Sequence, residues 1–109
     1  MPRYLLEGTA TPEVYASLIQ KPEDRADNAR GLIEKAGCKL IGYYNGVNNY
    51  KTYVIIECPD DAALAAIQFV MFAAGGITEG TATQIVTSAE TVGVAQDAAK
   101  LAGSYQTPD

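Results

Sequence analysis

The chain has 109 residues, of which 48% are hydrophobic and 19% are charged, with a formal net charge of -5 and no histidine. This length predicts one domain over residues 1–109, and the low charge indicates apolar surface covered by another subunit. The negative charge argues against nucleic acid as a partner, because phosphate backbones are bound through Lys and Arg. The lack of histidine excludes His-ligated haem or metal and Ser–His or Cys–His nucleophiles. We expect no metal and no cofactor.

The opening residues, MPRYLLEGTATPE, lack the apolar stretch of a signal peptide. Nor does any segment approach the roughly 18 apolar residues of a membrane-spanning helix. Two cysteines without a secretory signal are typical of reduced thiols. We therefore expect a cytoplasmic protein with no membrane contact.

The first part of the chain predicts a strand and then an interrupted helix. Residues 3–9 read RYLLEGT, a strand, and Thr11-Pro12-Glu13 is typical of a helix N-terminus. Pro22 disfavours a helical conformation in the residue before it, so we expect a break there before the helix resumes. Gly37 then ends the helix as a left-handed cap.

Residues 38–58 predict two antiparallel strands around a turn centred on residues 47–49. We expect residues whose numbers sum to 96 to lie opposite each other, because this register matches opposite charges, aromatic rings and apolar groups. Both faces carry bulky apolar side chains, so we expect one to pack on helices and the other on a second sheet. The predicted pairs are Cys38–Cys58, Lys39–Glu57, Leu40–Ile56, Ile41–Ile55, Gly42–Val54, Tyr43–Tyr53, Tyr44–Thr52 and Asn45–Lys51.

The rest of the chain predicts a helix, a strand and a further helix. Residues 62–74 contain one polar side chain, Gln68, and a helix this apolar is expected to be buried on more than one side. Residues 77–87 predict the last strand, Ser88 caps a C-terminal helix over 88–103, and 104–109 form a tail. The β-α-β-β-α-β order predicts an α+β, ferredoxin-like fold: a four-stranded antiparallel sheet with helices on one face, plus the extra helix.

Nearly the whole chain resembles the GYD-domain family, small bacterial proteins of the dimeric α/β barrel superfamily. The similarity rests on the opening strand, on TPE…KPEDRADNARGLIEKAGCKLIGYYNGVNNY, on VIIECPDD and on GTATQIVTSAE. The family usually carries Gly-Glu-Tyr-Asp before the third strand, whereas this chain reads Asn48-Asn49-Tyr50-Lys51, in which only Tyr50 matches. The resemblance implies sheet-to-sheet homodimers or multiples of them, with a pocket between sheet and helices, but no particular activity.

Four tyrosines in and around the hairpin are the strongest candidates for a ligand site, because each offers a flat apolar ring and an orienting hydroxyl. Gly42 could leave space above the sheet beside them. Tyrosines are also ordinary strand residues that fill interfaces, and we favour that interpretation. Asn48 could lie at a pocket mouth, although turn chemistry explains it more simply. The candidate ligand-binding residues are Tyr43, Tyr44, Tyr50, Tyr53 and Asn48.

Glu57 is a weak candidate for a general base, since a carboxylate in an apolar strand can have a raised pKa. A cross-strand ion pair with Lys39 is the favoured interpretation. Cys38 and Cys58 become neighbours in the proposed register and could form a redox-sensitive bond, although two reduced core thiols are favoured.

Two classes of function follow. The favoured one is a module that binds a small apolar or aromatic molecule or assembles with itself or other proteins. The alternative is a cofactor-independent monooxygenase or isomerase acting on an activated aromatic or enol substrate, with Glu57 accepting a proton.

Overall fold

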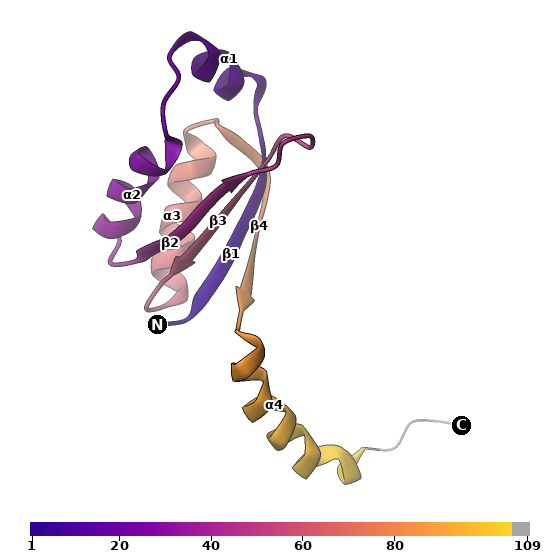
Figure 1. Cartoon of the computed structure of the whole chain (residues 1–109). Helices are drawn as coiled ribbons and strands as arrows, with labels where there is room; N and C mark the ends of the chain where they lie inside the picture. The colour runs from indigo at the N-terminus through magenta and orange to yellow at the C-terminus, as the bar shows by residue number, and fades with distance from the viewer. Residues whose placement is uncertain (106–109) are drawn as a thin grey trace.

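The computed structural model describes residues 1–105; the predicted tail at 104–109 lies largely outside the described residues. The chain forms the predicted order of strands and helices (Figure 1), with the first helix in two pieces. The elements are β1 (Arg3–Ala10), α1 (Pro12–Gln20), α2 (Arg25–Lys35), β2 (Lys39–Asn45), β3 (Lys51–Glu57), α3 (Asp61–Ala73), β4 (Ile77–Ile85), α4 (Ser88–Leu101) and the 3-10 turn η1 (Ala102–Ser104).

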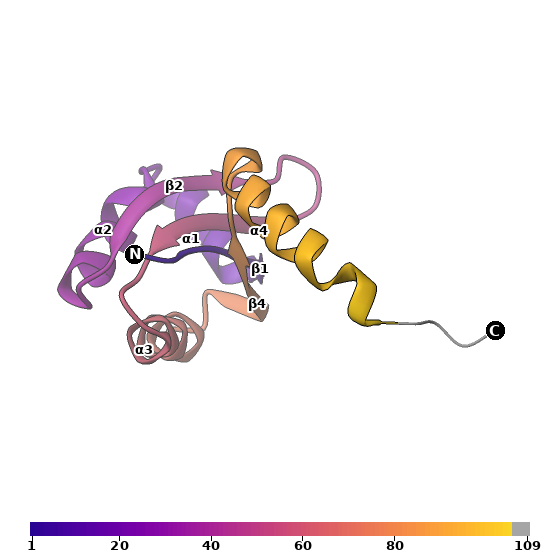
Figure 2. The same cartoon turned by 90° about the horizontal axis from the view of Figure 1, so that it is seen from below.

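The four strands make one antiparallel sheet in the order β2-β3-β1-β4. Helices α2 and α3 cover one face, which we call the helical face (Figures 1 and 2). We call the opposite face the open face. This arrangement confirms the α+β, ferredoxin-like prediction, including the extra C-terminal helix.

The helix ends follow local chemistry. The chain breaks between α1 and α2 at the predicted Pro22, and Asp24 caps α2 by accepting a hydrogen bond from the Ala26 N–H at 2.9 Å. Gly37, at φ +82°, ends that helix as predicted. The predicted cap of α4 was wrong by one residue. Thr87, not Ser88, caps α4, in a reciprocal capping box with Glu90.

The hairpin register is confirmed at one end and wrong at the other. Lys39 lies opposite Glu57 and the next pair is also as predicted, but Ile41 is an extra residue in β2 that forms a bulge. Beyond it every pair is shifted by one, because two residues of β2 oppose one of β3 at the bulge. The observed pairs there are Gly42–Ile55, Tyr43–Val54, Tyr44–Tyr53 and Asn45–Thr52.

The two cysteines lie side by side at the base of the hairpin, as predicted, with their Cα atoms 4.5 Å apart. The expectation of reduced thiols was wrong, because the structure joins Cys38 and Cys58 in a disulfide. Both residues belong to the buried core. The covalent bond thus ties the outer strand β2 to the central strand β3 beneath the helices.

The core lies between the helical face and the two covering helices. Alternate residues of β1 and β3 point into it, as the strictly alternating burial of both strands requires. Tyr4 is among them, and its hydroxyl donates a hydrogen bond to Asp61 Oδ1 at 3.2 Å. The fully buried side chains are Ile33, Ile56, Ile67, Val54 and Cys58.

Helix α3 is covered less than its sequence predicts. Leu64 and Ile67 are buried, but Phe69 and Phe72 are 77% and 67% exposed. The expectation of burial on more than one side was therefore wrong for the chain by itself, because Leu64 and Ile67 are the only buried residues of α3. This leaves two aromatic rings uncovered.

Helix α4 extends away from the sheet (Figures 1 and 2) and none of its residues is buried. The radius of gyration, 17.8 Å, reflects this arm, since a compact chain of this size has a radius of about 13 Å. Val92 and Leu101 are exposed on it. The arm thus presents apolar side chains that no other part of residues 1–105 covers.

Candidate functional site

A cleft of about 720 Å³ lies on the helical face, between α3 and the edge strand β4. Leu6 and Val54 of the two central strands line it, and α3 contributes Phe69 and Phe72. Most of its lining is apolar. This volume falls within the range of sites for drug-sized molecules, roughly 300–1,000 Å³.

Strand β4 forms the other wall of the cleft, and it is irregular at that point. The register between β1 and β4 shifts at Gly8, which faces both Glu79 and Gly80. A Cβ on Gly8 would overlap Ile77 Cγ2, so glycine permits the close crossing of the two strands. Glu79 itself has φ +54°, a conformation that non-glycine residues rarely adopt. The bulge places Glu79 in the lining of the cleft.

Charge in the cleft is sparse and of one sign. Among the described residues that line it, Glu7 and Glu79 are the only charged ones. Glu7 is engaged elsewhere, since its carboxylate pairs with Lys51 Nζ at 3.2 Å. Within residues 1–105, no Lys or Arg nitrogen lies within 4.0 Å of the Glu79 carboxylate.

A second cavity of about 220 Å³ adjoins the first and lies among α1, α2 and α3. Thr52, which is 4% exposed, lines both cavities and donates a hydrogen bond to Asn45 Oδ1 at 3.3 Å. Tyr43 and Arg25 line the smaller one. Burial raises the pKa of the Tyr43 hydroxyl, while the positive charge of Arg25 acts in the opposite direction.

The candidate tyrosines do not converge on one site. Tyr43 lies in the smaller cavity, whereas Tyr44 and Tyr53 are opposite each other on the open face. Tyr50 lies in the turn and packs edge-on against Tyr15 of α1, with ring centroids 5.7 Å apart. The space expected above Gly42 is filled by the Tyr44 ring, whose Cε2 would lie 2.7 Å from a Cβ there.

Asn48 is an exposed residue of the same turn. Its neighbour Asn49 organises the turn by donating a hydrogen bond to the Tyr53 hydroxyl at 2.8 Å and accepting one from the Lys51 N–H at 3.1 Å. The turn therefore has a structural explanation in these bonds, and neither asparagine lines the cleft or the smaller cavity.

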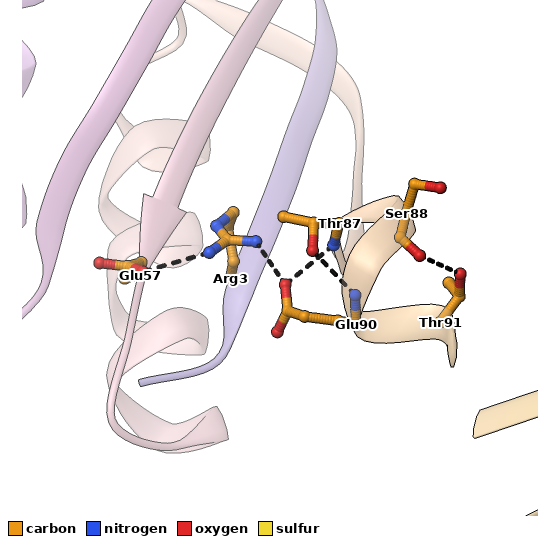
Figure 3. Close-up of polar contacts among 6 residues, drawn as sticks. All are labelled: Arg3, Glu57, Thr87, Ser88, Glu90 and Thr91. Carbon is orange, nitrogen blue, oxygen red and sulfur yellow. Dashed lines mark hydrogen bonds and ion pairs between the residues drawn. The ribbon is translucent and has the colours of Figure 1, made fainter. Parts of the chain in front are cut away.

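Glu57 lies on the open face, away from the cleft. Although Lys39 is opposite it in register, its ion pair is with Arg3, at 3.7 Å. Arg3 also pairs with Glu90 Oε1 of α4 at 3.2 Å, so one guanidinium bridges sheet and arm (Figure 3). The pKa of the Glu90 carboxyl is lowered. The largest cause is the hydrogen bond from the backbone N–H of Thr87, and the Thr87 side chain and Arg3 act in the same direction.

No group of three or more Cys, Asp or Glu side chains within residues 1–105 is placed to hold a metal ion. In the same part of the chain, no helix is long and apolar enough to cross a membrane.

The family resemblance led us to expect a pocket between sheet and helices, but sequence reasoning missed the residues that line this cleft. Phe69 and Phe72 read as parts of an apolar helix, and Glu79 reads as one acid in a threonine-rich strand. The one sequence signal for these residues was that the helix is apolar on all sides, because such a helix needs something besides the sheet to cover it.

Comparison with known proteins gives a family and a fold. The family model of the GYD domain matches residues 4–95. No curated protein matches the chain. An uncharacterised NIPSNAP domain protein from Burkholderia xenovorans is similar in structure, at 13% identity and a TM-score of 0.52, over 82% of this chain and 96% of that one.

Two further solved structures are similar at lower scores. An antibiotic biosynthesis monooxygenase has 15% identity and a TM-score of 0.47, over 80% of this chain and 98% of that one. PA3566 from Pseudomonas aeruginosa has 21% identity and a TM-score of 0.45, over 79% and 93%.

Proposed function

This chain belongs to the GYD-domain family, and we propose that it is a binding module that holds a small apolar or aromatic molecule in the cleft between α3 and β4. The observation that carries the proposal is the pair of exposed rings, Phe69 and Phe72, on the wall of a 720 Å³ apolar cleft. Exposed aromatic side chains are unfavourable in water, and a flat ligand between α3 and β4 would cover them.

We further propose that the protein is a homodimer, or a multiple of one, that pairs through the open face. That face presents Leu5 and Ile55, flanked by the ion pairs of Arg3 with Glu57 and of Lys51 with Glu7. Both side chains are half-buried, and apolar strand residues between charged groups are typical of sheet-to-sheet packing. The cleft opens on the other side of the sheet, so this pairing leaves it accessible.

The enzymatic alternative has less support. Its candidate base, Glu57, lies on the open face in an ion pair with Arg3. A proton acceptor must lie within hydrogen-bond reach of the substrate. A substrate in the cleft would be separated from Glu57 by the sheet.

Titration of the protein with 2-naphthylmethanol, a neutral aromatic probe, followed by NMR of the methyl groups, tests the binding proposal. We expect saturable shifts at residues that line the cleft, Met71 and Ile77 among them. The double variant F69A/F72A should lose most of the affinity.

Ile19→Ala serves as the control for this titration. Ile19 is 82% exposed on α1 and does not line the cleft, so its removal should leave binding unchanged. Shifts confined to methyl groups outside the cleft, or absent altogether, would refute the cleft as the binding site.

A further inference from the structure

We propose that the cleft selects organic cations, such as protonated aromatic or alkyl amines, over neutral molecules of the same shape and over carboxylates and phosphates. This inference rests on the proposed binding function and adds the chemical class of the ligand. It depends on three features of the cleft: its one available charge, its aromatic wall and its lack of basic lining residues.

The available charge is the Glu79 carboxylate. Of the two acids that line the cleft in the described chain, Glu7 is paired with Lys51, whereas Glu79 has no basic partner within 4.0 Å. Its position comes from the β-bulge opposite Gly8, where its backbone adopts φ +54°. Bulges redirect side chains beside binding sites, and a strained non-glycine residue is a reason to look for function there.

The aromatic wall faces the same cleft. Phe69 and Phe72 line the cleft from α3, while Glu79 lines it from β4. The face of an aromatic ring attracts a cation through its quadrupole. An ammonium group attached to an apolar body would thus find a carboxylate and aromatic faces in one cleft, with Leu6 and Val54 left to contact the body.

The cleft offers no favourable electrostatic contact to an anionic ligand. No Lys or Arg is among the described residues that line the cleft, and the whole chain carries a net charge of -5. A carboxylate or phosphate entering the cleft would lose water without gaining a basic partner, and Glu79 would repel it.

Three naphthalene probes with matched ring systems test the inference: 2-naphthylmethylamine, 2-naphthylmethanol and 2-naphthoate. At pH 7 and low salt, we expect the amine to bind roughly threefold to tenfold more tightly than the alcohol, as a partly exposed ion pair with a cation–π contact would give. The naphthoate should bind more weakly than the alcohol. Raising the salt to about 0.5 M should reduce the advantage of the amine, because it screens exposed charges.

Glu79→Gln is the decisive variant, and Glu34→Gln is its control. Glu34 is an exposed acid on α2 that does not line the cleft, so it changes the net charge equally. We expect E79Q to remove most of the preference for the amine, leaving only the part that the aromatic rings contribute, and E34Q to keep the preference of the native chain.

The outcomes separate the two proposals. If the alcohol binds in the cleft but the amine binds no better, or if E34Q removes the preference as fully as E79Q, cation selection is refuted and the binding function stands. If none of the probes binds in a manner that depends on Phe69 and Phe72, both are refuted.

Discussion

Replacing Phe69 or Ile67 by alanine distinguishes the residues of α3 that bind the ligand from those that stabilise the fold. The two residues lie on one helix, two positions apart, yet Ile67 is fully buried and Phe69 is 77% exposed. We expect Ile67→Ala to destabilise the fold strongly and Phe69→Ala to weaken binding with little effect on stability.

The magnitudes follow from the exposed fractions. An aromatic side chain offers roughly 200 Å², and about a quarter of Phe69 is covered, so at about 25 cal/mol per Å² its removal costs about 1 kcal/mol at most. Removal of a buried Ile side chain to alanine costs about 2–5 kcal/mol, because a cavity is added to the lost transfer energy. For binding, loss of the Phe69 ring should weaken the naphthyl probes about tenfold, or about 1.4 kcal/mol.

Urea unfolding followed by circular dichroism measures the first quantity, since the chain has no tryptophan and its helices give a clear signal. Probe titration measures the second. If Phe69→Ala destabilises the protein as much as Ile67→Ala does, the ring is buried in the folded assembly and the cleft has no such aromatic wall.

Three further predictions concern the sheet, the arm and the disulfide. Gly8→Ala should cost about 1–3 kcal/mol in urea unfolding, because the added Cβ overlaps the Ile77 side chain and pushes β4 outward; an unchanged midpoint would refute the close crossing. The pKa of Glu90 is lowered from its ordinary value of 4.5. Its bonds to Thr87 and Arg3 therefore stabilise the start of α4 fully above pH 4.5, and this stabilisation is lost as the pH falls through the lowered pKa. Proteolysis within 88–101 should therefore accelerate in acid, with an acid-stable protease, and Glu90→Ala, whose side chain can accept neither bond, should show fast cleavage at every pH. Reduction of the disulfide, which closes a loop of 20 residues, should lower the free energy of unfolding by about 3 kcal/mol, whereas Cys58→Ser should not respond to reductant.

The sequence predicts those parts of the fold that local chemistry determines. Pro22 breaks the first helix and Gly37 ends it, because a proline ring and a positive φ act on their own neighbours. The order of strands and helices then leaves few topologies, and the observed one is the ferredoxin-like arrangement.

The bulge at Ile41 was not predictable from the hairpin alone. Both registers place aromatic and apolar groups opposite one another, so cross-strand pairing does not choose between them. The shift carries Tyr43 onto the helical face, where it meets Arg25. That contact depends on where α2 lies, and hairpin residues carry no information about it.

The residues that line the cleft were missed for a related reason. Phe69 and Glu79 are ten positions apart, in a helix and a strand that each look ordinary. They share a cleft because β4 lies at the edge of the sheet, next to β1. Sheet order is a property of the whole chain, so the pairing of an aromatic wall with a carboxylate becomes visible only in three dimensions.

The bulge at Glu79 also bears on how the sheet avoids aggregation. Strand β4 is an edge strand, long and mostly exposed, and such edges are templates for pairing with other chains. Glu79 is the only charged residue between Ile77 and Ile85, and it coincides with the one register shift along that strand. Charges and bulges are among the devices that keep edge strands from pairing edge to edge. A substitution at residue 79 made to alter ligand choice would therefore also remove a safeguard of solubility.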